Sequence, residues 1–406
     1  MISPGLKTES YFRELRLFLE EICCNLCRFR HVEEDGVAPE DVRITQESYL
    51  GGDEFADIRV QVKQLAPYFL EVRYGYSPSQ IQTSLTRKYG PGRRLGGASK
   101  VVVLMDPHTS ASWAELEPET KRRLQDGLQV EVWDERSLFL MLRKYFGIEI
   151  DSISEENILK IRTAVDQAGG KFAFEETWTG DPLQEALIWH QGFWRLKQLR
   201  AGGGVAGRNI MPPGMYRGVA VVMADLCAFS SYVRDTRRDE IIRDCLTTFY
   251  AKARYEILNT GGMMYQFVGD AVLGLYGIPD QRDGYLESAF ACSQALLDIG
   301  NSVSNKWQGQ IDNVQSARGL HIGIALGDMQ IVSLRPFGRA HLGGIGEVIN
   351  LASRLLAHAG PSEIVASNAY FQALSPSYQT EFGDCQPLDV KNMGTVRAWK
   401  SVPQAF

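Results

Sequence analysis

The sequence lacks an apolar segment long enough to cross a membrane. Its longest apolar runs, residues 101–105 and 218–224, fall far short of the roughly 18 residues that a membrane-spanning helix needs. Its first residues also lack the basic segment and apolar stretch of a secretory signal. We therefore expect a cytoplasmic protein that does not engage a membrane.

Cysteine is scarce, and positive charge is not in surplus. The seven cysteines lack the paired spacing of a disulfide framework, so we expect reduced thiols. Cys24 and Cys27 have the spacing of zinc ligands, but no second pair completes a zinc site. The 43 basic and 49 acidic residues give a net charge of −6. This balance argues against a nucleic-acid partner.

The 406 residues have the composition of a folded protein and enough length for two domains. Glycine and proline are concentrated at 201–214, which we interpret as a linker. The linker separates a first domain at 1–200 from a second at 215–406. Apolar residues near helical spacing predict a connecting helix at 183–200.

Strand-like and helix-like segments alternate in both domains, which predicts an α/β fold with helices packed on sheets. In the first domain we expect a helix at 10–29 and strands at 57–63, 68–74, 100–105 and 128–133. In the second we expect strands at 217–224, 318–326 and 328–334, a hairpin at 263–276, and helices at 236–258, 285–304 and 348–358.

Two acidic residues of the second domain lie where apolar strands end. Asp225 follows the predicted strand 217–224, and Asp270 lies in the hairpin turn, where Gly269 permits a tight reversal. Either residue alone is more often a capping or turn residue. Together, at the ends of adjacent buried strands, they can supply oxygen ligands to Mg²⁺ or Mn²⁺.

Asn350 and Arg354 lie four residues apart in a predicted helix, so their side chains leave the same face. Arg can hold a phosphate through two parallel hydrogen bonds, and Asn can orient a ribose oxygen. The alternative is a solvated helix face, although Asn is unfavourable inside helices. This pair favours a site for an anionic, oxygen-rich ligand.

These motifs, in this order, resemble a class III nucleotidyl cyclase domain. The resemblance covers residues 217–400 and rests on ADLCAFS, QFVGDAVLGLYG, RGLHIGIALGD and IGEVINLASRL. Several spaced motifs in one order are more specific than any one of them. The resemblance implies a C-terminal α+β sandwich with a ferredoxin-like core, preceded by a separate α/β domain.

The resemblance also implies a reaction, in which a nucleoside triphosphate closes to a 3′,5′-cyclic monophosphate and releases pyrophosphate. Asp225, Asp270 and the backbone carbonyl of Leu226 would hold two divalent ions, Mg²⁺ or Mn²⁺. Arg354 would stabilise charge at the α-phosphate, and Asn350 would position the ribose.

Two subunits would share each substrate. In this family the metal aspartates of one subunit face the Asn and Arg of its partner, and this chain carries both sets once. The resemblance therefore implies a homodimer with two composite active sites. Lys391 would contact the terminal phosphates of the nucleoside triphosphate.

The positions that select the base differ from those of purine cyclases. The first position lies three residues before the hairpin Gly-Asp; adenylate cyclases of the family have Lys there, and guanylate cyclases have Glu. The second position lies seven residues before the Asn, and adenylate cyclases have Asp or Thr there. This chain has Gln266 and Gly343 at these two positions. The polar groups on the edge of a purine base would therefore lack their usual hydrogen-bond partners. Tyr265 and His341 either fill the space of a second purine ring or are ordinary core and loop residues.

These departures resemble the bacterial pyrimidine cyclases of the Pycsar antiphage systems, whose cyclic UMP or cyclic CMP acts on a separate effector. The carboxamide of Gln266 can serve uracil or cytosine, and the resemblance favours UTP. The alternatives are an adenylate or guanylate cyclase with an atypical base pocket and a catalytically inactive nucleotide-binding regulator. A degenerate site has no chemical need to keep all four candidate catalytic and metal residues.

The first domain carries two ambiguous patterns. Residues 51–55, GGDEF, match the signature of diguanylate cyclases, but no metal-binding strand precedes them, so we interpret the match as coincidence. Asp57, Glu71 and Arg73 are weakly similar to the restriction-endonuclease-like fold, which has Lys in place of this Arg. We expect exposed strand residues there and interpret the domain as a sensor or regulatory domain.

Overall fold

The computed structural model describes residues 9–174, 182–201, 210–334, 341–390 and 393–401. The chain forms two compact units, Met1–Ala168 and Gly169–Phe406. This division precedes the predicted linker because helix α6 (Pro182–Ala201) packs on strands of the second unit. None of the helices in these described ranges is long and apolar enough to cross a membrane.

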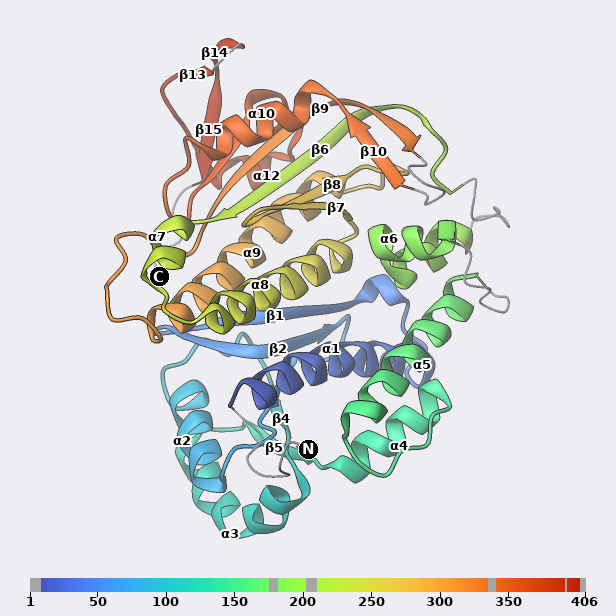
Figure 1. Cartoon of the computed structure of the whole chain (residues 1–406), viewed down its shortest axis with the longest axis vertical. Coiled ribbons are helices and arrows are strands. Elements are labelled where there is room, and N and C mark those ends of the chain that lie inside the picture. The colour runs from blue at the N-terminus through green and yellow to red at the C-terminus, as the bar shows by residue number, and fades with distance from the viewer. Residues whose placement is uncertain (1–8, 175–181, 202–209, 335–340, 391–392, 402–406) are drawn as a thin grey trace. The chain divides into compact units, whose positions relative to one another are not determined.

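The first unit contains a five-stranded sheet with helices packed on it (Figure 1). The strand order is β1-β2-β3-β4-β5; the first three strands are antiparallel and the last three parallel. The strands are β1 (Val42–Gly51), β2 (Glu54–Val62), β3 (Tyr68–Val72), β4 (Lys100–Leu104) and β5 (Gln129–Trp133). The helices are α1 (Glu9–Glu33), α2 (Pro78–Tyr89), α3 (Pro107–Arg123), α4 (Glu135–Phe146) and α5 (Glu155–Phe174), which crosses the division.

The GGDEF pentapeptide forms the turn between β1 and β2. Gly51, Gly52 and Asp53 all have positive φ, at 94°, 61° and 60°, and two glycines allow this left-handed backbone at little cost. The polar residues of β1 obscure its apolar alternation, so this strand was not among those predicted from the sequence. The pentapeptide therefore has a local structural role in a hairpin.

The second unit contains a sheet of order β12-β15-β11-β9-β6-β8-β7, with β10 paired to β9. Its strands are β6 (Gly214–Leu226), β7 (Met263–Val268), β8 (Ala271–Tyr276), β9 (Leu320–Leu334), β10 (His341–Ile345), β11 (Ile364–Ser367), β12 (Phe382–Asp384) and β15 (Ala398–Ser401), beside a separate hairpin, β13 (Leu388–Val390) and β14 (Gly394–Val396). The helices after α6 are α7 (Phe229–Asp235), α8 (Asp239–Asn259), α9 (Tyr285–Gln308), α10 (Glu347–Leu356), α11 (Asn368–Ala373) and α12 (Pro376–Gln379).

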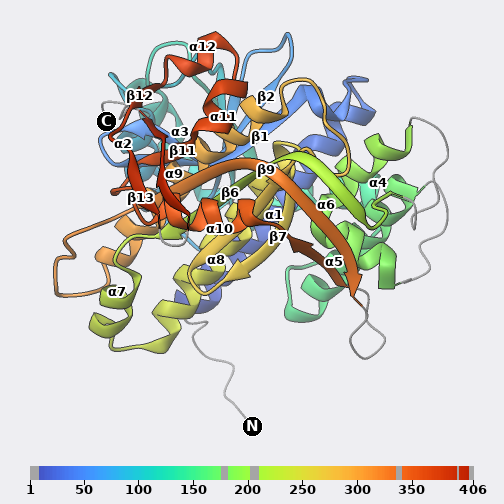
Figure 2. The ribbon, with the colours of Figure 1, turned by 90° about the horizontal axis from the view of Figure 1, so that it is seen from above.

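Alternation along β6 builds two cores, one on each face of this sheet. Ala220, Val222 and Ala224 pack with α8 and α9, whereas Val219 and Val221 pack with α6 and α10. Figure 1 shows α8 and α9 below the sheet and α10 above it, and Figure 2 shows α10 lying over β9 and β6. The predicted α/β fold class is confirmed.

Close packing of α10 depends on a glycine of β9. A side chain at Gly323 would come within 2.1 Å of the carbonyl oxygen of Ala352 in α10, so only glycine allows this approach.

The two strands predicted at 318–326 and 328–334 form one strand, because Gly327 between them stays paired with Val219 of β6. That expectation was wrong.

Candidate active site

Asp225 and Asp270 lie side by side at one end of the second-unit sheet. Asp225, near the end of β6, pairs with Ala271 of β8, and Asp270 immediately precedes Ala271 in the tight turn from β7. Gly269 shapes this turn with a φ of 63°. The pKa of Asp270 is raised to about 6, first by burial and then by the nearby Asp225 carboxylate. Both causes disfavour the ionised form.

The second neighbour of Asp225 is His321, which sequence reasoning missed. It lies opposite Asp225 on β9, with its Nε2 3.4 Å from Oδ2. This hydrogen bond is the main reason that the pKa of His321 is raised. Within the described residues, the buried Oδ1 of Asp225 has no hydrogen-bond partner. An unpartnered buried carboxylate oxygen calls for a ligand such as a cation.

The two carboxylates fit a divalent cation only with help from the backbone. In the part of the chain that the structure describes, no three His, Cys, Asp or Glu side chains are grouped to hold a metal. The aliphatic side chain of Leu226 has no ligating atom and is buried in the core of α8 and α9, so this residue can offer a cation only its backbone carbonyl. Carboxylates completed by a carbonyl and water suit Mg²⁺ or Mn²⁺.

Asn350 and Arg354 lie on α10, on the side of the sheet toward which Asp225 points. Asn350 is exposed. The Nη1 of Arg354 is buried and has no hydrogen-bond partner in the described ranges. No hydrogen bond or ion pair among those residues joins either side chain to Asp225 or Asp270. One chain therefore presents two pairs of functional groups that are not bonded to each other.

The candidate base-pocket residues lie on β7 and β10. Tyr265 occupies an irregularity in the pairing of β7, and its hydroxyl accepts a hydrogen bond from the backbone N–H of Gly344 at 2.7 Å. Tyr265 is thus hydrogen-bonded to Gly344, the residue that follows Gly343. Gln266 is exposed.

Two predicted residues are described only in part or not at all. His341 begins β10, where its backbone pairs with Leu334, and its side chain lies outside the described residues. Lys391 lies outside them entirely.

Tyr250 and Phe267 support the turn that carries Asp270. Their rings stack with centroids 4.3 Å apart, and the hydroxyl of Tyr250 donates a hydrogen bond to the carbonyl of Gly269. Burial, followed by Asp270, raises the pKa of Tyr250, so this hydroxyl remains a donor at neutral pH. Sequence reasoning missed Tyr250 because the pattern of α8 does not show which of its side chains reaches the turn after β7.

The acidic residues expected on an exposed strand of the first unit are buried instead. Asp57 and Glu71 are 6% and 0% exposed. The Nζ of Lys88 on α2 lies 3.1 Å from Asp57 and 2.8 Å from Glu71, and Arg73 pairs with both carboxylates. The expectation was wrong because α2 covers this face. Two cations pair with these two carboxylates, and the carboxylate of Glu47, 1% exposed, also interacts electrostatically with Lys88. Charged side chains of the unit itself thus partner one another in this cluster.

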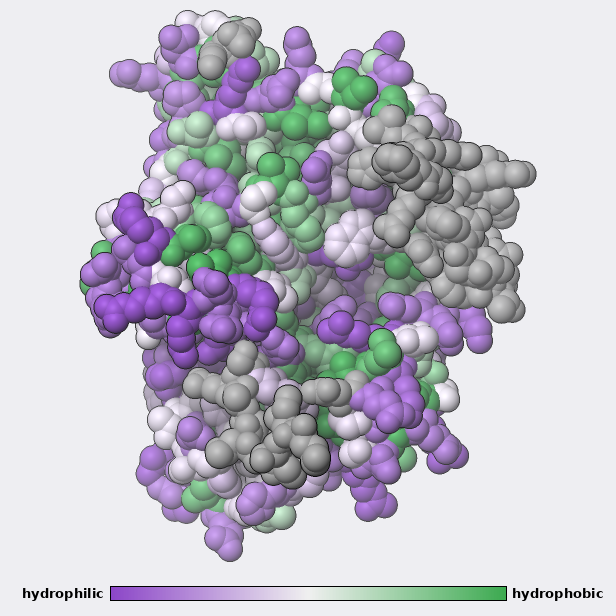
Figure 3. Space-filling view, viewed as in Figure 1, coloured by the Kyte–Doolittle hydropathy of each residue, from purple (hydrophilic) through white to green (hydrophobic). Residues whose placement is uncertain are grey.

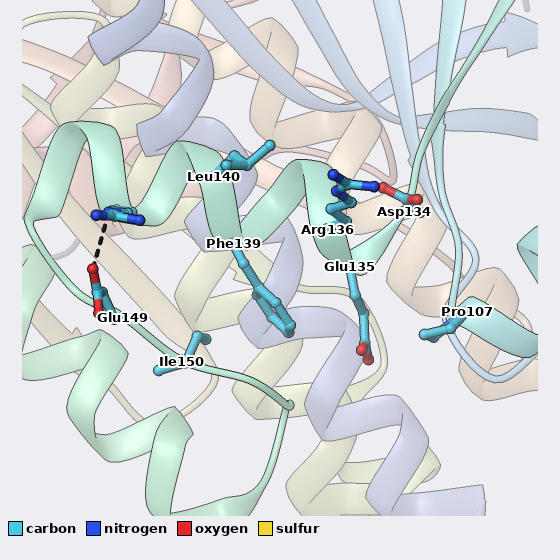
Figure 4. Close-up of a pocket in the computed structure, with 9 residues that line it drawn as sticks. Pro107, Asp134, Glu135, Arg136, Phe139, Leu140, Glu149 and Ile150 are labelled. Carbon is cyan, nitrogen blue, oxygen red and sulfur yellow. Dashed lines mark ion pairs between the residues drawn. The ribbon is translucent and has the colours of Figure 1, made fainter.

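Two surface features contain none of the predicted site residues. A pocket of about 500 Å³ in the first unit is lined mainly by α4 and the segment after it (Figure 4), and two of its lining residues, Arg143 and Glu149, form an ion pair of 3.0 Å. In the second unit, hydrophilic side chains gather over α7 and the beginning of α8 (Figure 3).

No protein-family model matches the chain. An uncharacterized protein of Mycobacterium tuberculosis is 26% identical over 164 residues, which are 40% of this chain and 28% of that protein. A second uncharacterized protein of that organism is 27% identical over the same length, which is 27% of its chain. The chain thus spans about a quarter of the length of the curated relatives it matches.

Solved structures similar to the chain include two cyclases. The adenylyl cyclase CyaB from P. aeruginosa has 20% identity and a TM-score of 0.42, covering 48% of this chain and 98% of its own. The guanylyl cyclase Cya2 has 21% identity and a TM-score of 0.41, covering 47% and 94%.

Replacing one aspartate of the pair should change the titration of the other. In Asp225→Asn without metal, we expect the pKa of Asp270 to fall from about 6 toward the ordinary Asp value, because a neutral amide no longer opposes ionisation. Carbon NMR titration of labelled Asp carboxyls measures this shift. An unchanged pKa would mean that Asp225 contributes nothing to it.

Removing the amine from the first-unit cluster should destabilise that unit. Lys88→Met keeps most of the volume but leaves Asp57 and Glu71 undercompensated, a loss of about 3–5 kcal/mol for breaking a buried ion pair. Amide hydrogen exchange in β2 and β3 should accelerate on the order of a hundredfold or more. Lys63→Met is the matched control, because Lys63 pairs with Asp41 while 65% exposed. Equal effects of the two variants would contradict a special role for Lys88.

Proposed function

We propose that the second unit is a nucleotidyl cyclase that converts a pyrimidine nucleoside triphosphate, UTP in preference to CTP, to the 3′,5′-cyclic monophosphate and pyrophosphate. The adjacent carboxylates of Asp225 and Asp270, with an unpartnered buried oxygen, carry this proposal. The buried, unpartnered Nη1 of Arg354 supports it, because it is a donor suited to a phosphate. The ordered sequence motifs support the same chemistry.

In the proposed reaction, the 3′-oxygen forms a bond to the α-phosphorus while the bond to the pyrophosphate oxygen breaks, and the 3′-hydroxyl loses its proton. Two divalent ions, when bound by Asp225, Asp270 and the carbonyl of Leu226, would lower the pKa of that hydroxyl and offset charge on the leaving group. Arg354 stabilises charge at the α-phosphate, and Asn350 holds the ribose.

The substrate would lie between two copies of the chain. Within one chain, no hydrogen bond or ion pair among the described residues joins the aspartate pair to Asn350 or Arg354. A second copy related by two-fold symmetry would supply the missing pair to each site. We therefore propose a homodimer with two composite sites, in which Lys391 contacts the terminal phosphates.

The preference for a pyrimidine is supported by the groups near the base positions. The exposed amide of Gln266 is available to a base edge. The hydroxyl of Tyr265 is held by the N–H of Gly344, the residue after Gly343. By resemblance to the antiphage cyclases, we further propose that the product signals to a separate effector and that the first unit senses or regulates.

A product assay tests the reaction and its base preference. We expect purified protein with Mn²⁺ and each of the four nucleoside triphosphates to give cyclic UMP as the main product and cyclic CMP as a lesser one, measured by mass spectrometry. Asp225→Asn should abolish both, since it removes a charged ligand of the proposed metal site. Dominant cyclic AMP would contradict the pyrimidine preference but leave cyclisation standing.

Mixing two inactive variants tests the composite site. Asp225→Asn and Arg354→Ala should each be inactive alone. An equal mixture should regain about a quarter of wild-type activity, because half of the dimers are mixed and each mixed dimer has one intact site of two. Native mass spectrometry verifies that mixed dimers form. Continued inactivity of verified mixed dimers would show that the two pairs act within one chain.

A further inference from the structure

Helix α6 contacts strand β7 immediately before and immediately after the candidate base-pocket residues. On one side, His190 is 5% exposed and its Nδ1 lies 2.7 Å from the backbone oxygen of Met264. On the other, the ring of Trp189 meets the ring of Phe267 edge-on, with centroids 6.0 Å apart. Two consecutive helix residues thus bracket the segment at 265–266.

The contact from His190 lies at the irregularity of β7. The pairing of β7 with β8 shifts register between Met264 and Gln266, so Tyr265 is the extra residue of a β-bulge. Because a carbonyl only accepts, the Nδ1 of His190 must carry the hydrogen. The bulge re-aims the neighbouring side chains, and the Tyr265 hydroxyl accepts from Gly344. His190 therefore holds the first residue of the bulge that creates this geometry.

The segment of α6 that makes these contacts is itself anchored to α8. Helical geometry breaks at Gly192, where φ is 69° and ψ is 153°. Arg254 of α8 donates to the carbonyls of Ile188 and Trp189 just before this break, at 3.3 and 3.0 Å, and its guanidinium lies 4.5 Å from the Trp189 ring centroid. A cation over an indole face and donors to helix-end carbonyls both stabilise this arrangement.

We propose that His190 is a positioning residue for base selection. By holding the Met264 carbonyl, it sets the bulge that directs Tyr265 to Gly344 and leaves Gln266 facing the nucleobase. Its ligand class is the base of a nucleoside triphosphate, so the inference rests on the proposed cyclase function. His190 acts through the Met264 carbonyl and does not itself touch the substrate.

The test compares His190→Phe with a conservative and a matched variant. His190→Phe keeps a planar ring but removes the donor, and we expect the ratio of kcat/KM for UTP to that for the other triphosphates to fall about tenfold, chiefly through KM. His190→Asn should restore the ratio, because its amide nitrogen can donate to the same carbonyl. Gln191→Met is the control: Gln191 is 0% exposed on the same helix, but its amide faces Met211 at 3.9 Å.

The outcomes separate this inference from the proposed function. Absence of cyclisation in the wild type defeats both. A wild type that cyclises while His190→Phe keeps its selectivity, or shifts it as much as Gln191→Met does, overturns only the role of His190. If His190→Phe is too unstable for kinetics, amide exchange decides: we expect faster exchange at 263–268 than in Gln191→Met, with β11 unchanged, and equal exchange overturns the inference.

Discussion

Strand β6 is paired antiparallel with β8 on one side and with β9 on the other, and the geometry of the candidate site depends on this double pairing. It puts Asp225 beside the turn that carries Asp270 and opposite His321. Two carboxylates this close repel each other, and the raised pKa of Asp270 records that repulsion together with burial. The paired strands, packed between α8 and α9 on one face and α10 on the other, hold the carboxylates in place against it.

The acidic pair of the first unit is buried and that of the second unit is half-buried, and the two pairs have different partners. In the first unit, Lys88 and Arg73 pair with Asp57 and Glu71, and the cluster is closed by its own side chains. In the second, the only ion-pair partner of Asp225 among the described residues is His321, which is charged only when protonated, and one buried oxygen of Asp225 has no hydrogen-bond partner. The first arrangement is typical of a structural ion cluster. The second leaves carboxylate oxygens available to bind a cation.

The neighbourhood of the aspartate pair extends well beyond the motif residues. Tyr250 reaches the turn carrying Asp270 from α8, and its ring stacks on Phe267. Phe267 in turn contacts Trp189 of α6. Helix α6, which precedes the candidate motifs in sequence, is thus in direct contact with β7, the strand that carries the candidate base-pocket residues Tyr265 and Gln266.

Local sequence patterns are enough to single out the candidate residues: an apolar strand precedes Asp225, a glycine turn precedes Asp270, and Asn350 and Arg354 have helical spacing. Which groups come into contact is fixed by the packing of the elements. His321 lies 96 residues from Asp225, whereas Tyr250 and Lys88 belong to helices next to β7 and β3 in sequence. Local patterns record neither the strand order nor which helix side chain faces a given strand or turn. Side chains alternate between the two faces of a strand, so the sequence shows which residues of β3 share a face with Glu71. It does not show whether that face is exposed to water or, as in the structure, covered by α2.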